Sequence, residues 1–246
     1  DGFQASMLLL LPFIAKDLHA SYAQSGLLGA AMNTLQVFLA LPAGYVAVRF
    51  GGLRVLIIGA LLSALGFIGV AFGPTLAILV LLFFLAGVGF AVFHPIAFSM
   101  VARAAEKKSI GRTMGLFTAT GDVGRIGLTA VITVLIVQFG WRNTALIYGF
   151  AGFLVFFMFV KYLFVSAHSP SIQEVHAKPQ KPLRLLEILK QPAFLMVNLA
   201  GMLDSFASSS LFVFLPFLYL QKGIDAKILG SFTATFFIGN ILGKYL

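Results

Sequence analysis

The chain has 246 residues, of which 60% are hydrophobic and 10% are charged, and its mean hydropathy is +1.00. Soluble domains carry about 25% charged residues, so this composition excludes an ordinary water-soluble fold, and the lack of cysteine excludes disulfides and thiolate metal sites. The 17 Lys and Arg residues outnumber the 8 Asp and Glu residues, but they lie in short segments between apolar runs, which is typical of cytoplasmic loops and not of nucleic-acid binding.

Long apolar runs divide the chain into predicted membrane helices. A helix needs about 20 mostly apolar residues to cross a hydrocarbon core about 30 Å thick. Runs close to this length predict eight helices, and the first and last look cut at the chain ends. They cover residues 1–15, 25–47, 54–72, 75–101, 113–139, 143–164, 192–220 and 227–246. We therefore expect an all-α membrane protein.

Glycines recur inside these helices at spacings that allow two helices to approach closely, which is how helices associate in lipid. They are Gly59, Gly66, Gly69, Gly87, Gly89, Gly149 and Gly152. No predicted strand precedes Gly87 and Gly89, so we assign this pair to packing and not to a nucleotide-binding loop. The sequence also lacks a nucleophile elbow, a His-Glu-x-x-His motif and a phosphate loop, so we expect no enzyme, no cofactor and no metal site.

The beginning of the chain is repeated about 204 residues later. In both places an Asp is followed by Leu-Pro-Phe and then by a Gly that opens the next apolar run: Asp1, Pro12 and Gly26 first, then Asp204, Pro216 and Gly230. Parallel repeats of apolar helices are typical of transporters built from two helical bundles. We expect the two copies to be related by an axis along the membrane normal.

The charges of the loops predict the orientation. Loops after the second, fourth and sixth helices hold eleven Lys and Arg residues, and those after the first, third, fifth and seventh hold four. The more basic loops, and the amino terminus, should therefore be cytoplasmic. The longest loop, 165–191, carries several prolines and a basic amphipathic stretch at 183–190. We interpret it as a linker between a six-helix bundle at 1–164 and the first two helices of a second bundle at 192–246.

One loop carries a family resemblance. Gly44, Arg49, Gly51 and Arg54 lie in the sequence Gly-Tyr-Val-Ala-Val-Arg-Phe-Gly-Gly-Leu-Arg, between the second and third predicted helices. This resembles the cytoplasmic signature of the major facilitator superfamily: a Gly, then Asp-Arg, then a Gly and a further basic residue. The resemblance implies a gating role for this loop and a plan of two six-helix bundles, of which about eight helices are present. Val48 replaces the acidic residue of the signature, so its charge relay is incomplete.

A second, shorter resemblance concerns the fourth predicted helix. The run Gly-Val-Gly-Phe-Ala-Val-Phe-His-Pro at 87–95, followed by Arg103, resembles the fosmidomycin-resistance-like efflux branch of the superfamily. Drug–proton antiporters of the family carry an Arg four residues before the Gly that matches Gly87. Phe83 stands at that position, so their proton-antiport arrangement does not carry over residue by residue.

Charged residues inside the membrane are costly and need a partner or water. Asp122 and Arg125 lie near the middle of the fifth helix, and their i, i+3 spacing places them on one face. Two interpretations stay open: a structural ion pair, or an Arg that binds an anionic substrate group while Asp122 holds the guanidinium or takes a proton. The flanking Gly121, Gly124 and Gly127 favour close helix contact in either case.

Further polar residues of the predicted helices are candidates for the solute or ion pathway. The resemblance places Asp1 and Asp204 beside a central cavity as possible proton carriers, with hydrogen bonding to neighbouring helices as the alternative. His94 can titrate near neutrality, or it can satisfy carbonyl groups that a kink at Pro95 releases. Asn33, Gln36 and Gln4 are candidates to contact the solute, and the alternative is that they join neighbouring helices by hydrogen bonds.

Together these features predict a secondary active transporter that moves a small solute by alternating access, with proton-coupled efflux as the first interpretation and proton-linked uptake as the alternative. A channel or a receptor that transports nothing is less favoured, because of the repeat. We expect a monomer whose partners are the solute and membrane lipid, with no nucleic acid, in the bacterial cytoplasmic membrane.

Overall fold

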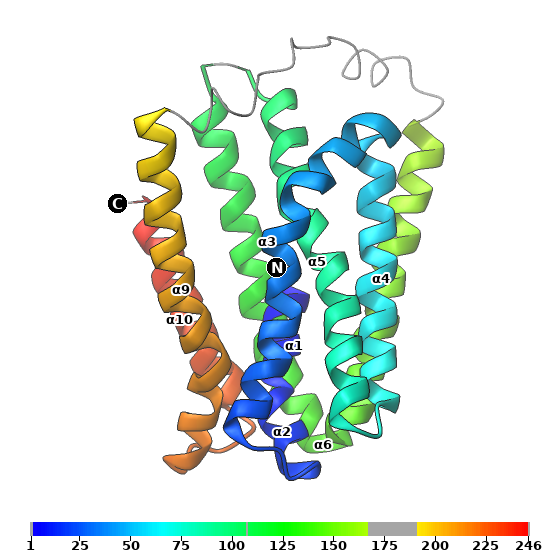
Figure 1. Cartoon of the computed structure of the whole chain (residues 1–246), viewed down its shortest axis with the longest axis vertical. Coiled ribbons are helices and arrows are strands. Elements are labelled where there is room, and N and C mark those ends of the chain that lie inside the picture. Colours follow the sequence, from blue (N-terminus) through cyan, green and yellow to red (C-terminus); the bar gives the residue numbers. More distant parts are fainter. Residues whose placement is uncertain (1, 107, 167–190, 246) are drawn as a thin grey trace.

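The computed structural model describes residues 2–106, 108–166 and 191–245, and every regular element in these ranges is helical (Figure 1). The helices run roughly along the long axis of the molecule, and the turns between them gather at its two ends. This confirms the predicted all-α fold. Residues 167–190 of the predicted linker, which include its amphipathic stretch at 183–190, lie outside the described residues, so the division into two bundles stays a prediction.

The first predicted helix is broken into α1 (Gly2–Leu9) and α2 (Leu11–Asp17). Pro12 lies in the first turn of α2, where a missing backbone N–H costs little because those donors have no partner inside the helix. The break itself was not predicted, since the apolar run continues through it without a polar residue.

The next two helices meet at a one-residue turn. At the start of α3 (Tyr22–Phe50), the Ser21 hydroxyl accepts from the backbone N–H of Gln24 at 3.2 Å. The side-chain oxygen of Gln24 accepts from the backbone N–H of Ser21 at 2.8 Å. This capping box fixes where the helix begins. Gly51, with φ of 90°, ends α3 and opens α4 (Gly52–Phe72), because that backbone conformation strongly favours glycine.

Two longer helices follow. α5 (Leu76–Ala104) continues through Pro95. α6 (Ile110–Ser166) covers the fifth and sixth predicted helices, and only Gly140, with φ of 78°, departs from helical geometry inside it. The predicted loop at 140–142 is therefore a sharp turn between two helical arms.

The last part of the chain forms α9 (Pro192–Gln221) and α10 (Leu229–Tyr245), joined by a turn at 222–228. α10 packs along α6, and α9 makes smaller contacts with α1, α2 and α3. In Figure 1 these two helices stand together beside the other six.

Glycine sets the distances between the helices of residues 2–166. A Cβ added to Gly66 would overlap Ala86 on α5, and one added to Gly87 would overlap the Met32 carbonyl of α3. Apolar side chains gain little from leaving lipid for a helix interface, so such close backbone contact is what holds membrane helices together. Added Cβ atoms would also meet a neighbouring helix at 3.0 Å or closer at Gly59, Gly69, Gly89, Gly149 and Gly152. The predicted packing role of these glycines is confirmed.

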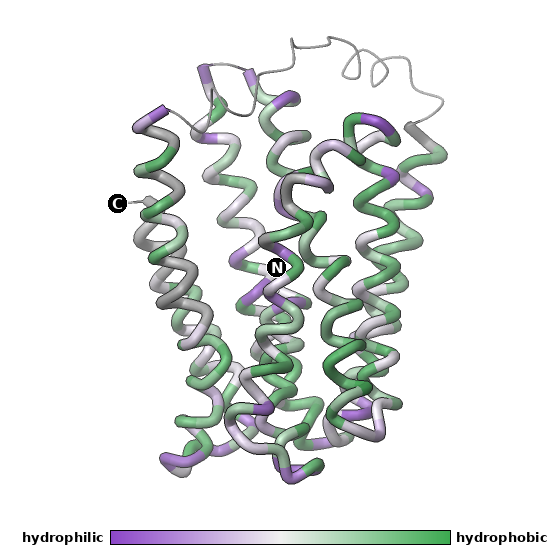
Figure 2. Tube along the Cα trace, in the orientation of Figure 1, coloured by the Kyte–Doolittle hydropathy of each residue, from purple (hydrophilic) through white to green (hydrophobic). Residues whose placement is uncertain are grey.

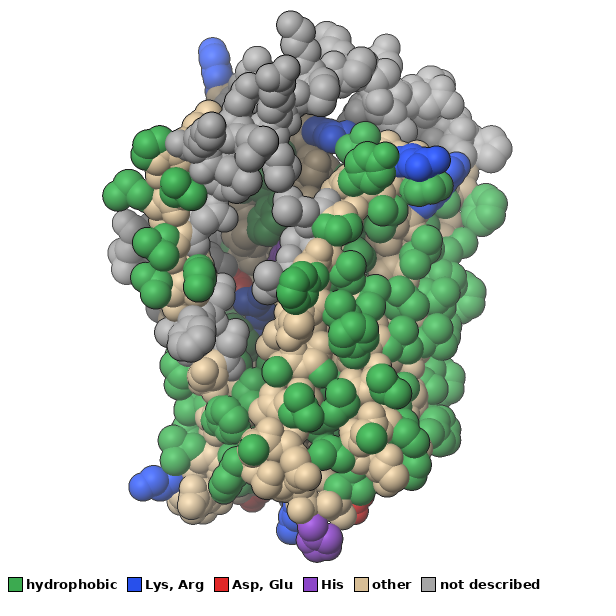
Figure 3. Space-filling view, viewed as in Figure 1, with side chains coloured by type: hydrophobic (Ala, Val, Ile, Leu, Met, Phe, Trp, Pro, Cys, Tyr) green, Lys and Arg blue, Asp and Glu red, His purple; other side chains and the backbone are tan. Residues whose placement is uncertain are grey.

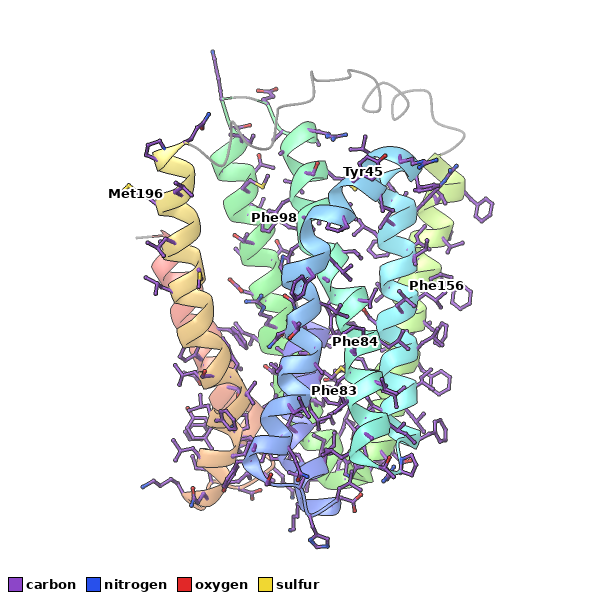
Figure 4. The ribbon with its side chains drawn as sticks, viewed as in Figure 1. Tyr45, Phe83, Phe84, Phe98, Phe156 and Met196 are labelled. Atoms are coloured by element: carbon purple, nitrogen blue, oxygen red, sulfur yellow. The ribbon has the colours of Figure 1, made fainter. Side chains whose placement is uncertain are left out.

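α1 and α2 lie at the centre of the packed core. The fully buried apolar residues of this segment include Met7, Leu9, Leu10, Leu11 and Ile14. Phe67 of α4 and Tyr148 of α6 pack edge-on around Phe3, with ring centroids 5.9 Å from it. Figure 4 shows Phe83 of α5 pointing into this core, whereas Phe156 and Met196 point away from the bundle.

The outer surface is apolar. Figure 3 shows hydrophobic side chains over the sides of the molecule and Lys and Arg side chains at its two ends, and Figure 2 shows the same division along the chain. By length and composition, three stretches of the described residues are able to cross a membrane: Gly52–Phe72, Leu76–Ala104 and Ile110–Phe164. The last is the two-armed α6. An apolar belt between two polar ends fits a helical bundle surrounded by lipid.

We call the end that carries the α3–α4 turn at 50–52, the end of α5 and the beginning of α6 the basic end. The opposite end carries the turns at 18–21, 73–75, 140 and 222–228.

Candidate solute-binding site

A pocket of about 110 Å³ lies where four helices meet. Residues of α1, α6, α9 and α10 line it: Gln4, Ala5, Leu8, Leu9, Arg125, Phe212, Thr233 and Phe237. The pocket thus takes side chains both from residues 2–166 and from residues 191–245. In Figure 3 a hollow opens beside α9 toward the basic end, and Lys or Arg and Asp or Glu side chains are visible inside it.

Arg125 brings a positive charge to this pocket. Its Nη1 donates to Asp122 Oδ1 at 3.2 Å, as the i, i+3 spacing predicted. The Asp122 side chain is only 1% exposed and does not line the pocket, whereas that of Arg125 is 24% exposed and does. The pocket lining therefore includes the guanidinium and not the carboxylate that pairs with it.

Two stacked rings also line the pocket. Phe212 of α9 and Phe237 of α10 have centroids 5.4 Å apart and planes within 9° of parallel. The Arg125 guanidinium carbon lies 5.4 Å from the centroid of the Phe237 ring, within the range of a cation–π contact. The charge of α6 and the aromatic wall of α9 and α10 thus meet at one point.

A chain of amide side chains leads away from the pocket. Gln4 and Gln36 each donate to Asn33 Oδ1 at 3.4 Å. Gln4 lines the pocket, and its partner Asn33 belongs to α3. Asn33 and Gln36 therefore support the pocket through Gln4 and do not line it.

His94 is not among the residues that line the pocket. Its ring stacks on Phe98 at 5.8 Å and contacts Phe93 at 6.0 Å, and Phe98 in turn meets Phe117 of α6. Figure 4 places Phe98 on α5 nearer the basic end. His94 therefore stands outside the pocket lining, although it lies within electrostatic reach of Arg125.

The predicted gating residues lie at the basic end. Gly51 forms the α3–α4 turn, Arg54 is exposed at the start of α4, and the Arg49 guanidinium lies 5.5 Å from the Phe50 ring. An added Cβ on Gly44 would meet nothing within 4 Å, so the structure gives this glycine no packing role.

Two predicted residues fall outside the description. Asp1 precedes the described range, and the side chain of Asp204 is not described although its helix is. The structure therefore does not place either carboxylate relative to the pocket.

The predicted close helix contact at the glycines beside Arg125 is confirmed at Gly124, because a Cβ on the facing Gly2 of α1 would lie 2.7 Å from the Gly124 carbonyl oxygen. A Cβ on Gly127 would meet nothing within 4 Å, so the prediction is wrong there. A small residue permits close packing only where another helix faces it.

Sequence reasoning missed the aromatic and hydroxyl part of the site, Phe212, Phe237 and Thr233. The chain has 27 Phe residues, so no local pattern distinguishes these two. Their shared feature is that they line the same pocket as Arg125, which lies more than 80 positions earlier in the chain. Only the fold shows this.

Toward the opposite end, the two parts of the chain close on each other. A Cβ on Gly29 of α3 would lie 2.8 Å from Val213 Cγ2 of α9, and the Tyr22 and Phe217 rings meet at 5.5 Å. On the other side, a Cβ on Gly230 of α10 would overlap the backbone of α6. These contacts lie between the level of the pocket and the opposite end, while the hollow of Figure 3 opens toward the basic end.

Several known proteins are similar to this chain. The uncharacterized MFS-type transporter YfnC of Bacillus subtilis is 27% identical over 143 residues, which are 57% of this chain and 35% of that protein. Monocarboxylate transporter 12 of Xenopus laevis is 30% identical over 129 residues, 52% of this chain and 28% of that protein. The multidrug resistance protein B homolog of Mycobacterium tuberculosis is 31% identical over 100 residues, 41% of this chain and 18% of that protein.

The match covers about a third of the length of the first of these relatives and less of the others. The profile of the Major Facilitator Superfamily, by contrast, matches residues 2–246, nearly the whole chain. This agrees with the helical bundle, with the loop signature around Gly51 and with the prediction of a transporter family in place of an enzyme family. The chain belongs to the Major Facilitator Superfamily.

Proposed function

We propose that the protein is a secondary active transporter that moves a small solute across the membrane by alternating access, with proton-coupled efflux as its activity. The observation that carries this proposal is the pocket around Arg125. It lies between two parts of the chain, and the close contacts between the described residues of those parts lie on one side of it. A site between two helical units that rock against each other is the arrangement that alternating access requires.

The loop charges orient this arrangement. If the basic end is cytoplasmic, as the excess of Lys and Arg predicts, the structure represents a state open toward the cytoplasm. The closed side then consists of the α3–α9 contact at Gly29 and Val213 and the α6–α10 contact at Gly230. Opening the other side requires both contacts to separate.

Efflux is supported by the name of one relative, the multidrug resistance protein B homolog. The resemblance of residues 87–95 to an efflux branch points the same way. Under this proposal a carboxylate of the pathway exchanges a proton for the exported solute, and Asp122, Asp204 and Asp1 are the candidates.

A second candidate function is proton-linked uptake of an anion, and Arg125 favours it, because its guanidinium lines the pocket. A proton that moves together with a monoanion makes the transported pair neutral. The relative named monocarboxylate transporter 12 agrees with an anionic solute.

The absence of cysteine allows a test of alternating access that needs no known substrate. A single cysteine at Ala5, in the pocket, should react with an impermeant reagent from either side of the membrane. A disulfide between Gly29→Cys and Val213→Cys, which the 2.8 Å approach places within reach, should abolish labelling from the opposite end and preserve it from the basic end. Reduction should restore both. Labelling from one side only in the protein without the disulfide would contradict alternating access.

Proteoliposomes that contain a pH-sensitive dye distinguish proton exchange from proton cotransport. We would add benzenesulfonate, a monoanion that does not cross lipid as a neutral acid, to the outside. If the protein exchanges the entering anion for a proton, the lumen becomes more alkaline. If it carries the anion and a proton inward together, the lumen becomes more acidic. A channel produces no accumulation of the anion against a gradient. Liposomes without protein serve as the control.

A further inference from the structure

The contact between α6 and α10 carries hydrogen bonds as well as close packing. The hydroxyl of the fully buried Thr133 accepts from the backbone N–H of Gly230 at 3.1 Å and donates to the Lys227 carbonyl at 3.2 Å. Both bonds join residues 2–166 to residues 191–245. We infer that this hydroxyl is a latch that holds the path closed toward the opposite end, and that its two bonds break when that path opens. This inference rests on the proposed function, because a latch requires two states of one path.

The latch lies between the pocket and the opposite end. On α6, Thr133 follows Arg125 by about two helical turns, in the direction of the turn at Gly140. On α10, Thr233 lines the pocket, and Gly230 lies three residues nearer to the start of the helix. The two helices that supply these lining residues are therefore bound to each other directly beyond the pocket.

The two backbone groups that Thr133 satisfies lie at the start of α10. Gly230 belongs to the first turn of that helix, where N–H groups have no acceptor inside the helix, and Lys227 belongs to the turn before it. A buried N–H or carbonyl group without a partner costs free energy, whereas the same group can bind water once the two helices separate. Loss of the hydroxyl therefore destabilises the closed state more than the open one.

The hydroxyl has a second acceptor on its own helix. The Ala130 carbonyl lies 3.4 Å from Thr133 Oγ1, farther away than the Lys227 carbonyl. When α10 moves away, the hydroxyl can donate to Ala130, as threonine side chains do inside helices. The polar group on α6 thus has a partner in both states, and only the bonds to α10 depend on the state.

The two contacts that close this side differ in kind. At α3 and α9, Gly29 packs against Val213, and this contact is apolar. At α6 and α10, Gly230 brings its own backbone against Thr133, because an added Cβ would lie 2.6 Å from the hydroxyl oxygen. Hydrogen bonds depend steeply on distance and angle, so a small separation of the helices breaks them. Removal of one oxygen atom from the α6–α10 contact should therefore shift the balance between the two states.

The test measures how fast Ala5→Cys, in the pocket of the full-length chain, reacts with an impermeant maleimide from the opposite end. Thr133→Val replaces the hydroxyl with a methyl group and should raise this rate about threefold to tenfold, the change in an equilibrium constant that one hydrogen bond produces. Thr133→Ala also removes the hydroxyl and should raise the rate. The rate from the basic end should change little, because the state open to that end stays dominant. Thr133→Ser keeps the hydroxyl and should restore the rate of the unchanged protein.

Thr129→Val is the matched control. Thr129 is equally buried on the same helix, but its hydroxyl donates within α6, to the Arg125 carbonyl at 2.7 Å. Its loss should leave the rate from the opposite end unchanged. An unchanged rate in either hydroxyl-free variant of Thr133, or an equal increase in Thr133→Ser or Thr129→Val, overturns the inference.

A disulfide between Gly29→Cys and Val213→Cys distinguishes opening from local damage. It should abolish the increase in Thr133→Val, because the path opens only when both contacts separate. An increase that survives the disulfide would come from a leak along α6 and α10 and would also overturn the latch. The proposed function is tested separately, since Ala5→Cys must react from both sides while Thr133 is intact. Reaction from both sides with no effect of the Thr133 variants refutes the latch and leaves alternating access in place.

Discussion

The backbone of Gly230 lies directly against Thr133. The Gly230 amide donates to Thr133 Oγ1 at 3.1 Å, and the same hydroxyl donates to the Lys227 carbonyl at 3.2 Å. One side chain of α6 thus serves both a donor and an acceptor at the start of α10, where backbone groups have no partner inside their own helix. Gly230 is also the predicted repeat partner of Gly26, whose added Cβ would meet Phe214 of α9 at 3.2 Å.

Replacing Gly230 with alanine should destabilise the protein. The new Cβ would overlap the Thr129 carbonyl oxygen, and such overpacking costs about 1–3 kcal/mol. Gly239→Ala on the same helix is the control, since a Cβ there would meet nothing within 4 Å and alanine favours the helix by about 0.5–1 kcal/mol. Thermal unfolding in detergent should show a lower Tm for Gly230→Ala only. Equal Tm values for the two variants would mean that α10 does not approach α6 closely at Gly230.

Arg142 should matter more for stability than its ion-pair partner Asp17. Its Nη1 donates to the Ala71 and Gly73 carbonyls at 3.0 and 3.1 Å, which satisfies the end of α4, whereas Nη2 lies 3.4 Å from Asp17 Oδ2. The pair is 40% and 49% exposed, so its own contribution is at most about 1 kcal/mol. Arg142→Ala should cost about 1–3 kcal/mol through the lost carbonyl bonds.

Asp17→Asn is the comparison, because it removes the charge but keeps an oxygen that can accept from the Trp141 indole at 3.3 Å. Chemical denaturation of both variants measures the difference. A cost for Asp17→Asn equal to that of Arg142→Ala would show that the ion pair, and not the carbonyl bonds, stabilises this end.

Single cysteines test the orientation that the loop charges predict. Ser109→Cys at the basic end, and Ser171→Cys in the linker outside the described residues, should be shielded from an impermeant maleimide in intact cells. Ala226→Cys in the α9–α10 turn should react, and all three should react in opened membranes. Labelling of position 109 in intact cells would reverse the orientation and with it the side toward which the described state is open.

Much of the fold could be predicted because the relevant signals are local. Apolar runs marked the helices to within a few residues at most ends, and the spacing of Asp122 and Arg125 predicted their contact. The break at Leu10 was missed because no polar residue marks it, and the two helical arms of α6 met with only Gly140 between them. Local signals reach no further than one helix or one turn.

The rest of the site depends on contacts between distant segments. Phe237 meets Arg125 from more than 100 residues away, and Trp141 meets Asp17 across 124. No local sequence pattern predicts either contact. The same reason explains the error at Gly127, where a small residue was present but an added Cβ would meet nothing within 4 Å.

The most direct test of the account compares Asp122→Asn, Arg125→Gln and the double variant in the protein expressed from its complete reading frame. Each single change leaves one buried charge without this partner and should lower the Tm, with a cost of about 3–5 kcal/mol. The double variant should recover a Tm near that of the unchanged protein but accumulate no solute in proteoliposomes, and Arg125→Lys should also be impaired because a point charge cannot replace the planar fork. A double variant that is stable and fully active would show that the pair only holds the helix together, and would contradict the assignment of Arg125 to the solute site.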